Sequence, residues 1–403
     1  MKILHTSDWH LGHTLYNYDR TVEQQAFLRQ LTRIVTEEQP DAMVVSGDIY
    51  HYSSPAAATQ KMYTDAMLNI HQACLEMTIV VTAGNHDSSS KLEIDSNLWQ
   101  HFGLNVVGNI ERTAEEVNLD KHIIEINNEK KTKGYVIAVP HVYPQNFPLL
   151  DTETPRDQRQ ARFFQALLDE VKKRNTAQLP VVLMAHLSIE GSDRSGHDES
   201  IGGIEYVPLS AMGEGYDYLA LGHIHCPQDI KGSHHHARYC GTPLPVSFDE
   251  TYPHSVSIIE LEKGAEPQIS TREIENPIPL VTLPHDPTPF EDALKLLEEY
   301  PEEKPAYLRL NVLTKGYLPP DCNEKASNAA KGKACKYCYI KTTRERQADT
   351  DESKPISIQE MQEMSPLEIA RLYYRETEGE EMDPELCQLM ETVMQKVKSK
   401  NNS

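Results

Sequence analysis

The sequence predicts an α/β fold for its first 275 residues, followed by a small α+β capping domain and a C-terminal helical segment. Two observations predict this class. Short apolar runs alternate with stretches of helical periodicity, which is the pattern of an α/β domain. Several of these runs stop next to a glycine and a polar residue, as strands do where they lead into a functional turn. A chain of 403 residues is too long for one typical domain, and we expect domains at 1–275, 278–346 and 347–403.

The first domain is expected to contain several buried strands. Each is a short run of aliphatic residues, and these runs lie at 42–46, 78–82, 135–139, 180–185 and 218–221. A helix is expected over residues 20–39, where Phe27, Leu31 and Ile34 recur at helical spacing.

The remaining chain contains three kinds of segment. Prolines between 277 and 289 predict a linker. A small α+β domain follows, with a helix at 290–300 and strands at 306–313 and 334–342. A polar linker then leads to two amphipathic helices, the first opened by a capping box at Ser365–Glu368 and the second by Asp383 and Pro384.

The charge balance bears on the partners that the chain can bind. With 39 basic and 61 acidic residues, the formal net charge is -22, so the average surface repels nucleic acid. A DNA enzyme with this balance must concentrate its positive charge, take it from metal ions or borrow it from a partner. The segment from Lys325 to Arg346 is the one clearly basic stretch, and we leave open whether it contacts a DNA backbone or forms solvated surface.

The cysteines and the apolar runs bear on the compartment. The seven cysteines are odd in number and irregularly spaced, which favours reduced thiols. Polar residues follow after only two apolar ones at the start, so we expect no secretory leader, and no run is long enough for a membrane span. The expected location is the cytoplasm.

Polar side chains follow each of the principal strands at its end. They are Asp8 and His10, Asp48, Asn85 and His86, His186, and His223 and His225. Because such ends meet at one edge of an α/β sheet, we expect these side chains to share one crevice. Imidazole, carboxylate and amide groups together form a mixed nitrogen and oxygen site, which suits Mn, Fe or Zn better than Ca.

This mixture of ligands is suited to the hydrolysis of a phosphoester. Two metal ions roughly 3.5–4 Å apart acidify a water and clamp the phosphate oxygens. One carboxylate must bridge such a pair, and Asp48 is the natural candidate. We therefore expect two divalent ions, with Mn2+ favoured.

The five strand-end elements, in this order, resemble the calcineurin-like metallophosphoesterases, which implies a sandwich of two sheets flanked by helices. Residues 1–12, MKILHTSDWHLG, and 239–250, YCGTPLPVSFDE, resemble one branch closely, the SbcD-type nuclease subunits, bacterial relatives of the meiotic-recombination break-repair nuclease. The resemblance is strong over residues 1–250 and mainly architectural beyond.

The resemblance implies roles for individual residues. One ion would be held by Asp8, His10, Asp48 and His225, and the other by Asp48, Asn85, His186 and His223. His86 matches the residue that contacts the scissile phosphate and protonates the leaving group. His51 matches a second active-site histidine found in some relatives, whereas others carry a different residue there.

The resemblance also implies activity and partners. It implies a nuclease subunit active on DNA in repair, recombination and replication, as an ATP-dependent double-strand exonuclease and a single-strand and hairpin endonuclease. The implied partner is an SbcC-type coiled-coil ATPase, in a heterotetramer around a homodimer of this chain. Two alternatives stay open: a phosphatase acting on non-nucleic-acid phosphoesters with the same metal core, and a non-catalytic scaffold. The complete ligand set argues against the scaffold, and the extra domains argue against the phosphatase.

Other polar motifs have simpler interpretations. The CxxC at Cys335 and Cys338 has no second pair, and in a strand its two side chains would not share a face. The histidines at 234–236 fit a solvated turn. His13 and His197 lie in polar loops near ligand motifs, where an ordinary loop position is favoured over contact with the substrate. Trp9 is expected in the core.

Overall fold

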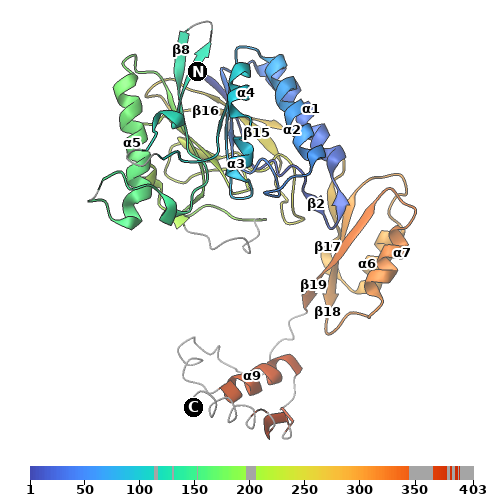
Figure 1. The fold of residues 1–403 in the computed structure, drawn as a ribbon. Coiled ribbons are helices and arrows are strands. Elements are labelled where there is room, and N and C mark those ends of the chain that lie inside the picture. The colour runs from blue at the N-terminus through green and yellow to red at the C-terminus, as the bar shows by residue number, and fades with distance from the viewer. Residues whose placement is uncertain are drawn as a thin grey trace. The chain divides into compact units, whose positions relative to one another are not determined.

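The computed structural model describes residues 1–112, 117–128, 131–151, 153–196, 206–344, 366–378, 382–383, 386–388 and 390. The chain forms two compact units, residues 1–344 and 345–403, which are described separately below (Figure 1).

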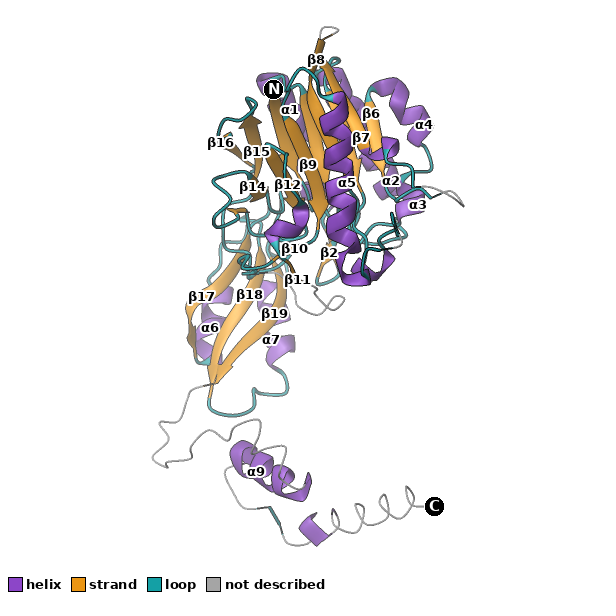
Figure 2. Cartoon of the chain, turned by 90° about the vertical axis from the view of Figure 1, so that its left-hand side faces the viewer, coloured by secondary structure: helices purple, strands orange, loops and turns teal. Residues whose placement is uncertain are grey.

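Two six-stranded sheets face each other in the first unit (Figure 2). The first sheet has the order β16 (Gln268–Glu273), β15 (Ser255–Glu260), β1 (Lys2–Thr6), β4 (Ala42–Ser46), β5 (Thr78–Thr82) and β6 (Leu104–Val107). The second has the order β13 (Gln228–Asp229), β14 (Ala237–Tyr239), β12 (Tyr218–Gly222), β9 (Val181–His186), β8 (Lys131–Ala138) and β7 (Ile123–Asn128). Fully buried aliphatic side chains such as Val44 and Val80 from one sheet and Val182 and Met184 from the other share the core between them.

Helices cover the outer face of each sheet. α1 (Thr21–Glu38) and α2 (Ala57–Ala73) pack on the first sheet, and α5 (Arg159–Arg174) packs on the second. The apolar stripe that predicts α1 faces the sheet, as an amphipathic helix requires. Short elements complete this part: β2 (Thr14–Leu15), β3 (Tyr18–Asp19), α3 (Ser89–Leu92), α4 (Ser96–Trp99), β10 (Ser188–Ile189) and β11 (Tyr206–Val207).

The topology brings the carboxyl ends of the central strands together. β1, β4 and β5 are parallel neighbours in one sheet, and β9 and β12 are parallel neighbours in the other. The two sheets also approach closely at these ends. A Cβ atom at Gly222 would lie 1.9 Å from the carbonyl oxygen of Ser46, so only glycine permits this contact between β12 and β4.

The rest of the first unit is a three-stranded parallel sheet with two helices, which we call the cap. Its strands have the order β17 (Leu280–Thr288), β18 (Tyr307–Thr314) and β19 (Lys336–Arg344), and α6 (Phe290–Glu298) and α7 (Cys322–Ala330) supply the crossovers. The structure differs here from the linker predicted at 277–289, because β17 occupies most of that segment. β17 is an edge strand whose register shifts between Leu283 and Thr288, and edges and irregularities are where a sheet tolerates proline.

The cap contacts the two-sheet part of the chain through polar and aromatic groups. The Tyr307 hydroxyl donates to Glu23 of α1 at 2.7 Å, and the Tyr18 hydroxyl donates to the carbonyl of Tyr337 at 2.9 Å. The Tyr307 ring also packs with Leu15 and Phe248. These contacts join the cap to α1 and to the segments that follow β1 and β14.

The second unit contains α9 (Pro366–Glu378), which coincides with the first predicted tail helix. Most of the second predicted helix lies outside the described residues. No helix in the described part of the chain has the length and apolar character needed to cross a membrane.

Candidate metal and phosphoester site

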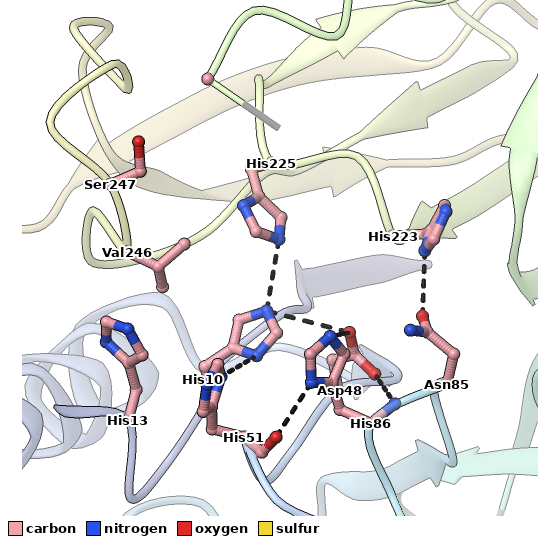
Figure 3. Close-up of a pocket in the computed structure, with 11 residues that line it drawn as sticks. His10, His13, Asp48, His51, Asn85, His86, His223, His225, Val246 and Ser247 are labelled. Atoms are coloured by element: carbon pink, nitrogen blue, oxygen red, sulfur yellow. Dashed lines mark hydrogen bonds and ion pairs between the residues drawn. The ribbon is translucent and has the colours of Figure 1, made fainter. Parts of the chain in front are cut away.

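The predicted strand-end side chains meet at one edge of the two sheets, and Figure 3 shows all of them except Asp8 and His186. Asp8 and His10 follow β1, Asp48 follows β4, Asn85 and His86 follow β5, His186 ends β9, and His223 and His225 follow β12. Asp8, His10, Asp48, His186 and His225 are buried. Residues separated by more than two hundred positions in the sequence thus share one site.

The backbone at this edge is strained. Asp8, His10, Asp48 and His223 have φ angles of 52°, 45°, 52° and 98°, in the region that favours glycine. Each such residue costs on the order of 1–3 kcal/mol and persists only where the surroundings fix it. The Asp8 amide donates to the Gly47 carbonyl and the His10 amide to the Asp48 carbonyl, both at 3.0 Å, so the two turns hold each other. Strain of this kind concentrates at functional sites.

A first group of ligand atoms surrounds His10. Its Nε2 atom lies 3.2 Å from Nε2 of His225 and 3.8 Å from Oδ2 of Asp48. One ligand atom each from Asp8, His10 and His225 lie within 4.8 Å of one another. Three residues from two sheets therefore converge with the spacing of a metal site.

A second group surrounds the Asn85 amide. Its Oδ1 atom lies 3.0 Å from Nε2 of His186 and 3.0 Å from Nδ1 of His223. The same His186 nitrogen is 3.5 Å from Oδ2 of Asp48. Asp48 therefore borders both groups, which is the position that a bridging carboxylate requires.

The donor set fits divalent ions. Two buried carboxylates, Asp8 and Asp48, face four imidazoles and an amide oxygen, and lone pairs in such number need a cation between them. The ring nitrogen of His186 that does not face the other ligands is fixed as well, since this Nδ1 atom donates to the Ser46 carbonyl at 2.8 Å. A partner on the second nitrogen is the arrangement that orients metal-binding histidines.

The charges in the site perturb each other strongly. Burial alone would raise the pKa of Asp48, but the adjacent His186 and His10 outweigh it and hold that pKa well below its usual range. Burial raises the pKa of Asp8 to about 6, with the charge of Asp48 adding to the effect. Burial would lower the pKa of His186, yet Asp48 raises it to about 9. Asp48 thus favours a proton on the adjacent His186, and a cation bound there would replace that proton's charge.

His86 and His51 lie together above Asp48. The His86 amide donates to Oδ1 of Asp48 at 2.9 Å, and the ring Nδ1 donates to the His51 carbonyl at 2.9 Å. The Nε2 atom of His86 therefore lies on the cavity side, 4.0 Å from Oδ2 of Asp48. The His51 ring stacks on that of His86, and burial together with His86 lowers the pKa of His51 to about 4. His51 is thus a neutral imidazole at neutral pH.

A cavity of about 170 Å³ opens onto these groups. Its walls are His10, His13, Asp48, His51, Asn85, His86, Gly196, His223, His225, Val246 and Ser247. All but one of the histidines proposed as ligands or catalysts line it. The exception is His186, which lies deeper, with a side chain 0% exposed.

Three residues near the site were not predicted to belong to it. His13 was expected to be an ordinary loop histidine, but it lines the cavity with its ring 4.6 Å from that of His51. His141 donates through Nδ1 to the His186 carbonyl at 3.1 Å and lies behind the second group. Glu250 contacts His225. None ends a strand in a recognisable motif, although His141 does follow the proline at the end of β8.

The remaining motifs adopt the simpler interpretations. Cys335 lies in the core of the cap, whereas Cys338 packs on the other side of the sheet, with Tyr307 and Phe248, so the two thiols do not share a face. His234 and His235 occupy a turn with positive φ, and Trp9 is 3% exposed in the main core. His197 lies outside the described residues.

The two-sheet fold, with a mixed nitrogen and oxygen site at its strand ends, defines a metallophosphoesterase, a class that implies divalent metal ions. The sequence profile of the calcineurin-like phosphoesterases matches residues 1–227, and that of the type 5 capsule protein repressor C-terminal domain matches residues 276–378. Two relatives are named as the SbcD component of the SbcCD nuclease. The one from Rhodobacter capsulatus is 33% identical over 74% of this chain and 75% of its own length. The one from Escherichia coli K12 is 27% identical over 95% of this chain and 94% of its own length. A third, from Bacillus subtilis, is 31% identical over 66% of this chain and 68% of its own length. The chain belongs to the SbcD family of calcineurin-like phosphoesterases.

Proposed function

We propose that this chain is the nuclease subunit of an SbcCD-type complex and hydrolyses DNA phosphodiester bonds. Its activities are ATP-dependent exonuclease cutting of double strands and endonuclease cutting of single strands and hairpins, in DNA repair and recombination. The observation that carries the proposal is the placement of Asp48 between two groups of ligand atoms, in a chain that matches a nuclease component over 95% of its length.

The proposal assigns the ligands as follows. Asp8, His10, Asp48 and His225 would hold one divalent ion, and Asp48, Asn85, His186 and His223 the other, with Mn2+ as the expected metal. When bound, such ions supply a water that ionises near neutral pH and a positive field for the phosphate oxygens. The protein holds the ligand side chains in place through the strained turns and the second-nitrogen contacts.

His86 is the proposed general acid. Its Nε2 atom lies on the cavity side, and its ring is held by the His51 carbonyl, so it can deliver a proton to the leaving oxygen. His51 has two roles in this proposal. Its carbonyl orients His86, and its neutral ring forms part of the wall beside the substrate.

The proposal also covers partners. Beyond DNA, the partner is an SbcC-type ATPase, the assembly is a heterotetramer built on a dimer of this chain, and the location is the cytoplasm. The cap, residues 278–346, would help to select DNA, and the tail, residues 347–403, would dock on the ATPase. The name of the relatives, which denotes one component of a two-part nuclease, supports a partner of this kind.

An assay with two substrates tests the activity. The purified chain in Mn2+ is given a single-stranded hairpin oligonucleotide and, separately, a chromogenic phosphate monoester. We expect cutting of the hairpin and little hydrolysis of the monoester. Efficient hydrolysis of the monoester without cutting of DNA would instead support the phosphatase alternative.

A further inference from the structure

Glu250 is a buried carboxylate that contacts a proposed metal ligand without facing the cavity. Its side chain is 0% exposed. Oε1 lies 3.0 Å from Nδ1 of His225, and Oε2 accepts a hydrogen bond from the Thr242 hydroxyl at 2.8 Å. A second imidazole, that of His254, lies 4.0 Å from Oε2. Both oxygens of Glu250 are thus held in fixed directions.

This contact determines how His225 presents its other nitrogen. A carboxylate oxygen accepts, so Nδ1 of His225 carries the proton that joins them, and in the neutral ring Nε2 is the nitrogen with the free lone pair. That Nε2 atom faces His10, 3.2 Å from its Nε2. A carboxylate behind a histidine in this way fixes the tautomer and the ring angle, and makes the imidazole a better ligand.

The residues just before Glu250 are held by the cap. Arg309 of β18 donates through Nη1 to Oδ1 of Asp249 at 2.7 Å, and Lys341 of β19 reaches the same oxygen at 3.1 Å. The Arg309 guanidinium also lies over the ring of Phe248, 5.2 Å from its centroid. Arg309 is only 5% exposed and its guanidinium is fixed by several contacts, whereas the Asp249 side chain that it holds is 52% exposed.

We propose that Glu250 is a positioning residue for His225, and that the cap sets its place through Arg309 and Asp249. The chain of contacts runs from β18 through one ion pair and one peptide bond to the carboxylate that orients the ligand. The affinity of the ion held by His225 then depends on whether the cap is seated. The inference rests on the metal site of the proposed function, and it adds a link between that site and the part of the chain expected to select DNA.

The link is tested by metal binding, without reference to catalysis. The metal-free full-length chain is titrated with Mn2+, and free Mn2+ is counted by electron paramagnetic resonance. Loss of an outer partner of a ligand typically weakens metal binding about 10–100-fold. We expect Glu250→Gln to weaken the binding of one of the two ions about 10-fold and to leave the affinity of the other unchanged. Arg309→Met, which touches no ligand, should weaken the same ion in the same direction.

Two further variants separate this role from a structural one. Arg309→Lys keeps a cation beside Asp249 and should restore most of the affinity. Lys325→Met removes another ion pair of the cap, the one with Asp321 at 3.2 Å, and should leave both affinities unchanged. A loss of affinity with Lys325→Met as large as with Arg309→Met would show general loosening of the cap and would overturn the proposal.

The variant that carries both Glu250→Gln and Arg309→Met tests whether Arg309 acts on the ion through Glu250. If Arg309 acts through Glu250, the loss with both substitutions should be clearly smaller than the product of the two single losses. Independent losses that multiply would overturn the route, and unchanged affinity of both ions in the single variants would overturn the role of Glu250. A wild-type chain that binds no Mn2+ would instead contradict the metal site itself, and with it the proposed function.

Discussion

Asp48 is the residue on which both groups of ligands depend. Its Oδ2 atom lies 3.8 Å from His10 in one group and 3.5 Å from His186 in the other. We expect Asp48→Ala to lose both ions and all cutting, because neither group keeps its shared carboxylate. Elemental analysis of the purified variant measures the ions. Asp65→Ala, an exposed aspartate of α2, is the control, and two ions retained in Asp48→Ala would contradict the bridging role.

His86 differs from Asp48 in what its loss should do. It is the proposed acid and not a ligand, so His86→Gln should keep both ions and lose roughly 10²–10⁴-fold in the rate of cutting. The rate on an oligonucleotide and the metal content are measured together. His101→Gln, at an exposed histidine, serves as control. Loss of metal in His86→Gln would make His86 a ligand.

His122, which is not one of the residues of the site, should make the stability of the fold depend on pH. It is fully buried, its Nδ1 donates to the Ala138 carbonyl at 2.7 Å, and its Nε2 has no partner. Burial lowers the pKa of His122 from 6.5 to about 4, so the folded state disfavours the proton. This contribution to stability is therefore fully present above the pKa of His122 in the unfolded chain. The free energy of unfolding falls as the pH drops through 6.5 toward 4, by about 2 kcal/mol near pH 5.

Urea unfolding of the metal-free chain at about pH 7 and about pH 5 measures this effect. His122→Gln keeps a donor for the Ala138 carbonyl but cannot be protonated, so its stability should fall less on acidification. The other histidines are the same in both proteins. The difference between wild type and variant in the stability lost on acidification therefore isolates His122. If His122→Gln loses as much free energy of unfolding between the two pH values as the wild type does, His122 is not the cause.

At the residue scale, a site residue could be predicted from the sequence when it lay at or just after the end of a strand. The structure brings together the seven residues predicted as ligands, because each directly follows or ends a strand, and strand ends are readable from apolar runs. His13, His141 and Glu250 reach the site from loops, and their neighbours are far away in the sequence. Glu250 stands inside the motif at 239–250, yet nothing in that motif indicates its contact with His225.

Elements were predictable where one pattern dominated. β4 and β5 coincide with the predicted runs residue for residue, since the centre of each is a buried run of apolar residues. β17 was obscured by its prolines, which suggested a linker. The crossover helix α7 was missed, because its buried residues are Cys322, Ala326 and Ala330, which give a weak apolar signal.

Lys333 shows how an element of the cap uses a cation. Its Nζ donates to the carbonyls of Leu297, Glu298 and Tyr300, which lie at the C-terminal end of α6. A cation there satisfies carbonyls that the helix leaves unpaired and interacts with its dipole. We expect Lys333→Met to lower the free energy of unfolding by about 1–2 kcal/mol.

Thermal or urea unfolding measures this loss, with Lys325→Met on α7 as the control for removing one positive charge. The result also bears on the basic stretch at 325–346. If Lys333 served DNA and not α6, the variant would bind DNA less tightly at unchanged stability.

At the scale of the whole molecule, the acidic balance has to be reconciled with a DNA substrate. Within the basic stretch, Lys333 serves α6, Lys336 lies over the ring of Tyr307 at 5.0 Å, and Lys341 pairs with Asp249. These three cations therefore already have partners within the chain, although the Lys341 side chain is 47% exposed. With a net charge of -22, bound metal ions and a partner protein are further sources of positive charge for a phosphate backbone.

The tail provides the prediction that distinguishes a complex-bound nuclease from a free phosphatase. Residues 1–344 form one compact unit without it, so deleting residues 355–403 should leave the fold, the two ions and the cutting of single strands intact. Apolar side chains at Ile369 and Leu386 are 37% and 40% exposed. Short helices that expose such groups are marginal alone in water and gain stability from a partner surface. The deletion should therefore abolish binding to the ATPase and ATP-stimulated cutting of duplex ends.

Co-elution of the two purified proteins in size-exclusion chromatography measures the binding, and metal content and hairpin cutting show that the catalytic unit is intact. A single substitution tests the helix itself. Ile369→Asp places a charge on the exposed face of α9 and should weaken binding by at least about 10-fold, because an unpaired charge would have to be buried in the contact. Val22→Asp, at an exposed apolar residue of α1, is the matched control and should bind normally. Co-elution of the deleted chain at unchanged affinity would place the dock elsewhere, and unfolding of that chain would show that the tail helices belong to the main core.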